Sequence, residues 1–521
     1  MASYAAREVA ELLDGSRAAT VLDGGRWSDG VWWPVHSPAD TRMVIGEHAV
    51  SSPDAVEAAV GAAVRAFPAW RDLGAAGRAS LLSVAAAELA RLAPLAARVI
   101  GMEVGKVEAE CAVDAGGAAR LLEGFAAQAE AAMAPVDLTA DPATRPADAA
   151  VLHRAPVGPV AVIAPWNTPA YLTVNMAAPA LAAGCPVVVK PPEAAPLAVT
   201  ALLERLAAML PPGVVNVVQG PGAPVGEQLV SHAAVRAVLF TGGVVAGRRV
   251  LTLASETVKK VHLELGGNDP AVVLDSAVVD DTLLRELIAG SFSSTGQICY
   301  NVKRIYVHRS MYDELVDGLS QMLSDLVVGH PFDPQAHIGP LTTEAGHART
   351  RRLLAELDAC GAKVQRCGRR ASSAAWEHGY FVDPHLVTGV PPDAPLVLEE
   401  QFAPVLPVLP FDEDDEAVAR ANRTEYGLGS SVWSRDVAHA EAVARRIEAG
   451  NTFVNVHRIG ASVGSVPFGG WKQSGLGRNH GAYSFAACTE EHAVIRFDDA
   501  ARSLPGLDRW SALSRKEPGR V

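Results

Sequence analysis

The sequence predicts an α/β protein that contains two doubly wound lobes. Short runs rich in β-branched residues recur at intervals of about 25 residues between 159 and 266, with helical patterns between most of them. This alternation is typical of parallel strands joined by crossover helices. A second series of strand patterns, separated by long amphipathic segments, extends from about 268 to 460. The length of 521 residues also exceeds what a single hydrophobic core usually supports.

Residues 53–132 are predicted to be mainly helical. Apolar residues recur three or four positions apart in residues 53–70, 76–106 and 107–132, which is the helical period. A polar segment that contains proline follows at 134–156. The sequence leaves two interpretations of it open, a linker or an exposed hairpin that reaches toward another subunit.

The first lobe is expected to bind a nucleotide at one edge of its sheet. Its strand patterns cover residues 159–165, 186–191, 214–219, 236–242 and 260–266. Polar or glycine-rich loops follow four of these strands, and open α/β sheets bind ligands at the carboxyl ends of their strands. No G-x-G-x-x-G fingerprint is present, so a dinucleotide would bind in another manner. The glycines at 242–247 also have a purely structural interpretation, as a strand-to-helix turn.

The second lobe repeats the α/β pattern without an internal sequence repeat. Its strand patterns cover residues 270–274, 304–308, 404–411, 430–434 and 452–456. The segment 343–361 is a long amphipathic helix pattern, and the tail at 498–521 has the composition of a loosely ordered segment.

Composition favours a soluble enzyme with a small-molecule partner. Hydrophobic residues make up 49% of the chain and charged residues 20%, as in well-packed globular proteins. The net charge of −13 argues against nucleic acid or an anionic membrane as a partner. The six scattered cysteines suggest neither a disulfide framework nor a metal site. The N-terminus lacks a signal peptide pattern, and the apolar segments are expected to be shorter than a membrane span, so we expect a cytoplasmic location.

Three residues have the chemistry of a covalent active site. Cys299 ends a run of small residues, and a nucleophilic thiolate needs donors for the oxyanion that it creates. The side-chain amide of Asn167 is one such donor. Glu264, between Leu263 and Leu265, is a candidate general base whose pKa an apolar setting would raise. Each residue also has a structural interpretation: an apolar filler, a turn cap and a salt-bridge partner, respectively.

Nine segments in order resemble the aldehyde dehydrogenase superfamily from about residue 35 to 497. They are PWN (165–167), VVKPPEAAPL (188–197), FTGGVVAG (240–247), LELGGNDP (263–270), GQIC (296–299), GPL (339–341), GYFVDP (379–384), EEQFAPV (399–405) and PFGGWKQSGLGR (467–478). The resemblance implies that Cys299 is the nucleophile, Asn167 the side-chain half of the oxyanion hole, and Glu264 the base that activates water. No metal is implied.

The resemblance also implies a domain arrangement. Residues 1–133 and 157–265 would form an atypical Rossmann domain that binds NAD(P), and residues 266–483 the catalytic domain. Residues 134–156 and 484–497 would form an oligomerisation segment of a homodimer or homotetramer, with 498–521 as the C-terminal tail.

By resemblance, the cofactor residues come from several motifs. Lys190 and Glu193 would lie at the adenosine ribose, Gly242, Gly243 and Gly247 near the pyrophosphate, Glu400 and Phe402 beside the nicotinamide ribose, and Trp166, Gly226 and Leu265 in the same site. The Glu193 carboxylate accepts from ribose hydroxyls and would repel a 2′-phosphate. NAD is therefore preferred over NADP, although Lys190 would offset part of that repulsion.

The implied reaction is NAD(P)-dependent oxidation of an aldehyde to a carboxylic acid through a thiohemiacetal and a thioester. Glu264 favours hydrolysis, because the coenzyme-A-acylating branch of the family lacks a glutamate there. An acylating or esterase-like relative, and a non-catalytic binding protein of the same fold, remain alternatives. The chain departs from the family pattern at Gly243 (often serine), Met176 (commonly lysine) and Ala403 (usually glycine). A proton relay through that lysine must therefore be absent or rerouted.

The substrate pocket is the least defined part of the site. Its expected lining is Thr168, Leu172, Asn175, Ile298, Tyr300, His457 and Arg458. His457 and Arg458 have two interpretations, as partners of a polar substrate group or as a solvated loop. The absence of an aromatic residue at Thr168 favours a bulky or aromatic aldehyde.

Overall fold

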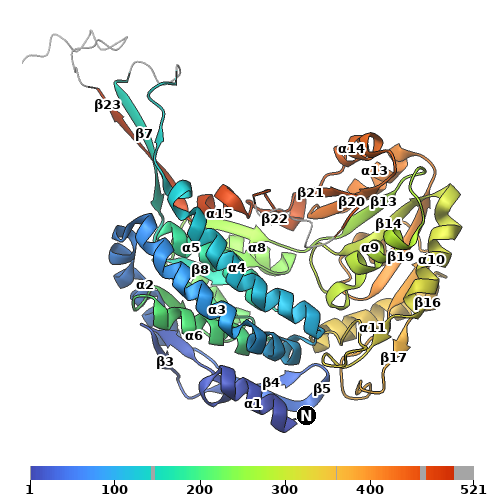
Figure 1. Ribbon diagram of the computed structural model, residues 1–521, viewed down its shortest axis with the longest axis horizontal. Helices are drawn as coiled ribbons and strands as arrows, with labels where there is room; N and C mark the ends of the chain where they lie inside the picture. The colour runs from blue at the N-terminus through green and yellow to red at the C-terminus, as the bar shows by residue number, and fades with distance from the viewer. Residues whose placement is uncertain (1, 142–146, 360, 458–464, 498–521) are drawn as a thin grey trace, which may run out of the picture. The chain divides into compact units, whose positions relative to one another are not determined.

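The chain divides into two units in the computed structural model (Figure 1), which describes residues 2–141, 147–359, 361–457 and 465–497. The first unit comprises Met1–Ala132 and Pro156–Cys488, and it holds both large sheets. The second comprises Met133–Ala155 and Thr489–Val521. Segments far apart in the sequence therefore build each unit.

The first large sheet has eight strands in the order β22-β12-β11-β8-β9-β10-β2-β3. Its parallel core consists of β12 (Lys260–Glu264), β11 (Ala237–Thr241), β8 (Val160–Ile163), β9 (Val187–Lys190) and β10 (Val215–Val217). Nearly all of these residues are buried, because helices cover both faces of a doubly wound sheet. The five predicted strands are confirmed. The antiparallel strands β22 (Gly475–Leu476), β2 (Thr20–Leu22) and β3 (Gly25–Trp27) were not predicted, because two or three residues are too few for a pattern.

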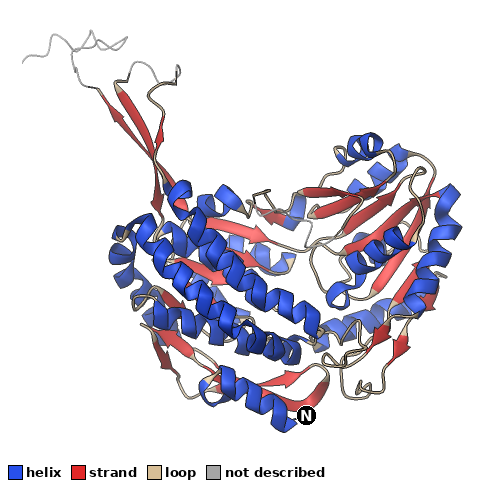
Figure 2. Cartoon of the chain, in the orientation of Figure 1, coloured by secondary structure: helices blue, strands red, loops and turns tan. Residues whose placement is uncertain are grey.

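Helices lie alongside the strands of both large sheets, as Figure 2 shows in blue and red. The α-helices up to Ser255 are α1 (Ala2–Leu12), α2 (Pro53–Asp72), α3 (Gly74–Val104), α4 (Glu108–Met133), α5 (Pro169–Ala183), α6 (Leu197–Met209), α7 (Glu227–Ser231) and α8 (Val244–Ser255). Helix α2 begins at Ser52, whose hydroxyl accepts a hydrogen bond from the Ala55 N–H. Helices α3 and α5 end at Gly105 and Gly184, both in the left-handed conformation that favours glycine.

Helix α3 corrects one expectation from the sequence. Among the described residues it is the one helix long and apolar enough to cross a membrane by length and composition. Its Leu82, Leu89 and Ile100 side chains are nevertheless buried within the first unit, and the helix contacts α5 and α6. A core helix of a globular protein has the same character, so the length and composition alone are weak grounds for a membrane span.

The second large sheet has seven strands in the order β16-β18-β19-β14-β13-β20-β21. These are β16 (Lys363–Arg366), β18 (His385–Thr388), β19 (Val405–Phe411), β14 (Val302–His308), β13 (Asp269–Val273), β20 (Gly429–Trp433) and β21 (Asn451–Val454), and β16 alone is antiparallel to its neighbour. The five predicted strands are again present, whereas β16 and β18 were not predicted.

Apolar clusters cover both faces of this second sheet. The adjacent residues Val272 and Val273 of β13 belong to different clusters, as expected for side chains that alternate between faces. Helices α9 (Asp281–Phe292) and α10 (Tyr312–Ser324) supply apolar side chains to one cluster. Helices α11 (Glu344–Ala359), α12 (Pro395–Leu398), α13 (Asp414–Asn422) and α14 (Val437–Ala444) supply the other.

The second unit contains a three-stranded sheet in the order β23-β7-β6. Strands β6 (Val136–Asp137) and β7 (Ala149–Pro156) pair antiparallel, with Val136 opposite Leu152. Segment 134–156 is thus a hairpin and not a linker. Strand β23 (Thr489–Arg496) adds the third member, and helix α15 (Gly481–Ala487), just before it, belongs to the first unit. The tail 498–521 lies outside the described residues.

Two smaller sheets complete the first unit. The order of one is β1-β5-β4, formed by Arg17–Ala18, Asp40–Ala49 and Trp32–Ser37, and the other pairs β15 (Val327–Val328) with β17 (Arg369–Arg370).

Candidate active site

The first sheet brings two of the three predicted chemical residues to one edge. Asn167 follows β8, and Glu264 is the last residue of β12. Strands β8 and β12 both pair in parallel with β11, so their carboxyl ends lie at the same edge. The third residue, Cys299, lies in the loop before β14 of the second sheet.

Asn167, Glu264 and Cys299 line two neighbouring cavities of the first unit. One cavity has a volume of about 350 Å³, the other about 330 Å³, and Asn167, Thr241, Glu264 and Cys299 line both. The three residues singled out for their chemistry therefore lie where the two cavities meet. A reacting group at this junction would be accessible from both sides.

The loop that carries Cys299 is fixed by hydrogen bonds to three other segments. The Ser294 N–H donates to Glu110 Oε1 at 2.6 Å, and the Thr342 N–H donates to Gln297 Oε1 at 3.0 Å. Asn167 Nδ2 donates one hydrogen bond to the Gln297 carbonyl at 2.9 Å. The second N–H of the Asn167 amide does not take part in this bond. Gly296 has a φ of +78°, and a Cβ there would collide with the backbone of Ala403. The small-residue run before Cys299 therefore permits a tight backbone path.

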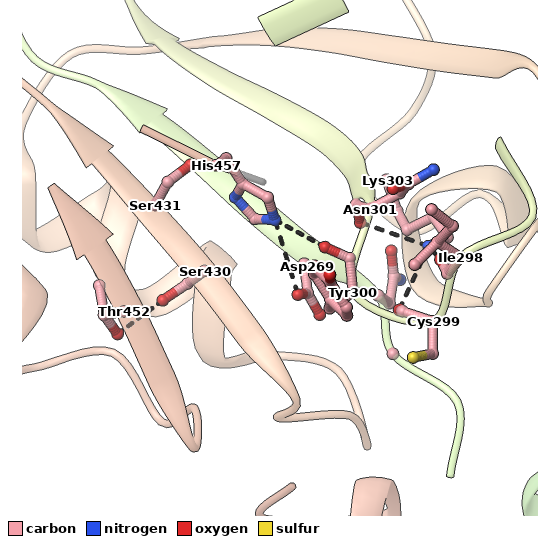
Figure 3. Close-up of polar contacts among 12 residues, drawn as sticks. Asp269, Ile298, Cys299, Tyr300, Asn301, Lys303, Ser430, Ser431, Thr452 and His457 are labelled. Atoms are coloured by element: carbon pink, nitrogen blue, oxygen red, sulfur yellow. Dashed lines mark hydrogen bonds and ion pairs between the residues drawn. The ribbon is translucent and has the colours of Figure 1, made fainter. Parts of the chain in front are cut away.

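Lys303, which the sequence reasoning missed, holds the backbone of the same loop by hydrogen bonds. Its ammonium group is buried and donates to the carbonyls of Ile298 at 2.6 Å, Cys299 at 3.3 Å and Asn301 at 3.3 Å (Figure 3). Burial raises the pKa of the Cys299 thiol to about 12, and the charge of Lys303 acts in the opposite direction. The resting group is thus a thiol, which needs a base before it can act as a nucleophile.

His457 does not lie where the sequence reasoning expected it. It is fully buried and lines neither cavity. Its Nε2 lies 2.7 Å from the Tyr300 carbonyl oxygen and 3.8 Å from Asp269 Oδ2 (Figure 3). Burial lowers the pKa of His457 to about 4, so the imidazole is neutral and its Nε2–H donates to the carbonyl.

This position contradicts both interpretations of His457, because a fully buried side chain outside the cavity linings neither contacts the substrate nor lies in a solvated loop. The pattern placed the residue near the nucleophile, but sequence alone does not give the direction of a side chain in a loop. Arg458 lies outside the described residues.

Glu264 is buried, and its carboxylate is held by fewer polar contacts than the Cys299 loop. Neither carboxylate oxygen has a hydrogen-bond partner in the described part of the chain. His262 Nε2 lies 3.3 Å from Glu264 Oε1. Burial raises the pKa of the Glu264 carboxyl, whereas His262 and Arg478 lower it. A carboxylate with a raised pKa is a stronger base, as general base catalysis near neutral pH requires.

Six of the predicted cofactor residues line the second cavity. They are Trp166, Gly242, Gly243, Leu265, Glu400 and Phe402. Glu400 Oε1 accepts a hydrogen bond from the Gly267 N–H at 3.0 Å, and the Trp166 and Phe402 rings meet edge to face with centroids 5.6 Å apart. Thr343, Gly346 and Arg349, at the start of α11, also line this cavity and were missed. The nearby GPL motif at 339–341 is the signal that would have pointed to them.

The other four predicted cofactor residues lie outside the lining of this cavity. Lys190 is buried and donates to the carbonyls of Pro191 at 3.0 Å and Gly220 at 2.8 Å. Burial lowers the pKa of Lys190 to about 8. Gly226 packs against the Lys190 side chain, Glu193 is exposed, and Gly247 contacts Leu265, where a Cβ would collide.

The residues of this edge fit a dinucleotide. Gly243 is the N-cap of α8, and a Cβ at this position would meet no atom within 4 Å. Helix N-termini attract phosphate groups through their unpaired N–H donors, and an absent side chain allows close approach. The half-buried carboxylate of Glu400 supplies an acceptor for hydroxyl groups in the same cavity.

The first cavity has a predominantly apolar lining. The predicted residues Thr168, Leu172, Asn175, Ile298 and Tyr300 all contribute to it. Val113, Tyr171, Phe468 and His480 were missed, although Phe468 lies within the PFGGWKQSGLGR motif. Lys106 and Asp114 also reach this cavity, and they form a buried ion pair with an Nζ to Oδ2 distance of 3.3 Å.

Two departures from the family pattern have visible contacts. Met176 is buried, and its sulfur lies 3.4 Å from Thr241 Oγ1, so a thioether occupies the space beside the end of β11. Ala403 is buried against Gly296. Within the described residues, no cluster of three or more histidine, cysteine, aspartate or glutamate side chains is arranged to hold a metal ion.

Comparison with known proteins agrees with the architecture and with the motifs. The chain matches the aldehyde dehydrogenase family over residues 27–494. Betaine aldehyde dehydrogenase of Mesorhizobium japonicum is 36% identical over 477 residues, which are 90% of this chain and 95% of that protein. The NADP-dependent succinate-semialdehyde dehydrogenase of Escherichia coli is 35% identical, over 91% of this chain and 96% of its own length. The crystal structure of an NAD-dependent aldehyde dehydrogenase from Sinorhizobium meliloti superimposes with a TM-score of 0.88 at 32% identity, covering 94% of this chain and 96% of that one. The chain therefore belongs to the aldehyde dehydrogenase family, whose members use NAD or NADP, and is an oxidoreductase that acts on an aldehyde.

Proposed function

We propose that this enzyme oxidises a bulky, uncharged aldehyde to the carboxylic acid by a hydrolytic mechanism. Cys299 is its nucleophile, Asn167 its oxyanion donor and Glu264 its base. The observation that carries this proposal is the position of these three residues at the junction of an apolar cavity and a second cavity lined by the predicted cofactor residues.

The first step is addition of Cys299 to the aldehyde. Because burial holds the group as a thiol, Glu264 in the same cavities removes its proton and releases it to solvent before the hydrolytic step. The sulfur then bonds to the carbonyl carbon. The resulting oxyanion accepts hydrogen bonds from the Cys299 backbone N–H and from the Asn167 amide N–H that is not bound to Gln297.

The second cavity positions the cofactor beside this intermediate. A nicotinamide bound there would supply the hydride acceptor, and the acyl group would remain on Cys299 as a thioester. Trp166, Leu265, Glu400 and Phe402 line the nicotinamide side, and Gly242, Gly243 and the start of α8 suit the pyrophosphate. Lys190 and Glu193, with Gly226 and Gly247 packed nearby, are proposed for the adenosine half. The exposed Glu193 carboxylate favours NAD over NADP.

Release of the acid requires water and a base. Glu264 takes a proton from water, and the water oxygen attacks the thioester carbon while the carbon–sulfur bond breaks. A carboxylate at this position supports hydrolysis over transfer to coenzyme A. The unpaired oxygens of Glu264 also support this role, because a base held by hydrogen bonds would be weaker.

The lining of the apolar cavity supports a bulky substrate without a charge. Leu172, Ile298, Tyr300 and Phe468 surround the space, and Asn175 contributes a buried Oδ1 without a hydrogen-bond partner. Lys106, a lysine in the lining, is paired with Asp114. Among the described residues the cavity therefore offers no unpaired lysine or arginine to hold a substrate carboxylate.

Assembly and location complete the proposal. The sheet of the second unit would pair subunits in a homodimer or homotetramer. The cofactor domain would consist of residues 1–133 and 157–265, and the catalytic domain of residues 266–483. Three apolar side chains here are about half exposed: Val494 and Ile495 of β23, and Phe497, which directly follows this strand. Such exposure is expected for a surface that another subunit covers. Cys111, Cys185, Cys367 and Cys488 are buried free thiols, which supports the reducing cytoplasm.

The test is NADH or NADPH formation with an aldehyde panel of aliphatic, aromatic and carboxylated members. A bulky aromatic or aliphatic aldehyde should give the highest kcat/KM, and NAD should be preferred over NADP. Best activity on a carboxylated aldehyde would contradict the substrate class. Reduced cofactor from no aldehyde would contradict the mechanism.

A further inference from the structure

His262 and Glu264 face each other at the end of β12. They lie two residues apart on one strand, so both side chains extend from the same face of the sheet. Both are buried, with His262 Nε2 3.3 Å from Glu264 Oε1. Neither that nitrogen nor either carboxylate oxygen has a hydrogen-bond partner elsewhere in the described residues.

Two glycines make room for this pair. A Cβ on Gly477 would collide with His262 Nδ1, and a Cβ on Gly469 would lie 2.9 Å from Glu264 Oε1. Both glycines have positive φ and flank β22, which pairs antiparallel with the end of β12. The backbone at these two glycines thus lies close against the imidazole and the carboxylate, which keeps the two groups together.

The remaining groups near Glu264 are unsuited to receive its proton. Arg478 lowers the pKa of Glu264 by its charge, but a guanidinium is already protonated, and this one donates to the carbonyls of Gly470 and Gly477. Thr241, opposite Glu264 in the sheet, contacts the sulfur of Met176, which does not titrate. Cys299 lies across the shared cavity and carries the acyl group at this stage. His262 is the neighbour that has a basic atom directed at the carboxylate.

We propose that His262 is a positioning residue that holds Glu264 and takes over its proton during thioester hydrolysis, an inference that rests on the proposed function. The water oxygen bonds to the acyl carbon, the carbon–sulfur bond breaks with its electron pair on sulfur, and the water proton passes to Glu264. The carboxyl O–H then gives that proton to Nε2 of His262. This regenerates the carboxylate and leaves an imidazolium, which returns the proton to solvent or to the thiolate.

The experiment follows the acyl-enzyme directly. Wild type, His262→Gln and His262→Leu are mixed with NAD and the best aldehyde, quenched at short times, and analysed by intact mass spectrometry for acylated protein. Formation of NADH in the first turnover is recorded in parallel. His385→Gln is the matched control, because His385 is a half-buried strand histidine of β18 that lines neither cavity.

Both His262 variants should form the acyl-enzyme at nearly the wild-type rate and lose it at least about ten-fold more slowly, the lower range for loss of a proton-transfer group. The pH at which decay is half-maximal should rise in His262→Leu, because removal of the imidazole removes a group that lowers the pKa of Glu264. His385→Gln should match the wild type.

Unchanged decay and an unchanged pH midpoint in both His262 variants would overturn the proposal and leave His262 as a packing residue. Should His262→Leu fail to fold, His262→Gln carries the same test, since glutamine keeps a polar group but does not titrate. Absence of any acyl-enzyme in a wild type that makes NADH would instead overturn the proposed mechanism itself.

Discussion

The nucleophile and the base are held in opposite ways. Side chains fix the backbone of the Cys299 loop by hydrogen bonds: Lys303 donates to three of its carbonyl oxygens, and His457 donates to a fourth. Glu264 ends a rigid strand, yet its carboxylate oxygens have no hydrogen-bond partner in the described residues. The difference fits their tasks. A nucleophile and its oxyanion donors must keep one geometry through the reaction. A base that serves first a thiol and then a water instead needs oxygen lone pairs that no hydrogen-bond donor occupies.

Replacement of the nucleophile should have the largest effect. Cys299→Ala removes the atom that bonds to the substrate, so we expect NADH formation to fall by about a thousand-fold or more. Cys367→Ala is the control, because this buried cysteine lines neither cavity. Equal activity of both variants would remove Cys299 from the mechanism.

Replacement of the base should separate the two halves of the reaction. Glu264→Gln keeps the shape of the side chain but cannot accept a proton, so turnover should fall about a hundred-fold, a typical contribution of a general base. If Glu264 acts chiefly on water, one equivalent of NADH should still form in the first turnover. Stopped-flow measurement of NADH checks this. Steady turnover at the wild-type rate would show that another group activates water.

The pH dependence of hydrolysis follows from the burial of Glu264. Its pKa is raised above the ordinary 4.5, and only the carboxylate accepts a proton. The rate of acyl-enzyme decay should therefore be lost as the pH falls through this raised pKa, at a higher pH than for an exposed glutamate. A decay rate that stays constant down to pH 4.5 would contradict a buried base.

Removal of the buried ammonium group of Lys303 should destabilise the Cys299 loop. Lys303→Met leaves three carbonyls without their donor, at a cost of about 1–3 kcal/mol of unfolding free energy for each buried group left unpaired. It also removes the charge that lowers the pKa of Cys299. Iodoacetamide labelling of Cys299 at a fixed pH should slow, and activity should fall about ten-fold for a one-unit rise in the thiol pKa. Lys303→Arg, which keeps the charge, is the comparison. Faster labelling in Lys303→Met would contradict the electrostatic role.

The same contrast explains what the sequence predicts and what it does not. Most of the ten predicted sheet strands are recognisable because they are buried on both faces and read as apolar runs, whereas β21 is only half-buried. Cys299, Asn167 and Glu264 each had a structural interpretation as well, and the family resemblance of the motifs around them decided for their chemical roles. The roles of Lys303 and His262 were not predicted, because each depends on a contact with a backbone or side-chain atom that the chain brings close only after folding. Both interpretations of His457, as a partner of the substrate and as part of a solvated loop, were wrong for the same reason: its position in the chain was informative, whereas the direction of its side chain was not.

Mutation of His457 gives the smallest expected effect and the sharpest test of that correction. His457→Leu removes the donor to the Tyr300 carbonyl but leaves the cavity lining unchanged, since His457 lines neither cavity. We expect kcat to fall a few-fold, about the effect of one hydrogen bond worth 0.5–1.5 kcal/mol, with KM for the aldehyde unchanged. Thr168→Leu, a change within the lining, should instead raise KM for bulky aldehydes by narrowing the space. A rise in KM without loss of kcat in His457→Leu would show that His457 contacts the substrate after all, because removal of a ground-state contact with the aldehyde raises KM and leaves kcat unchanged.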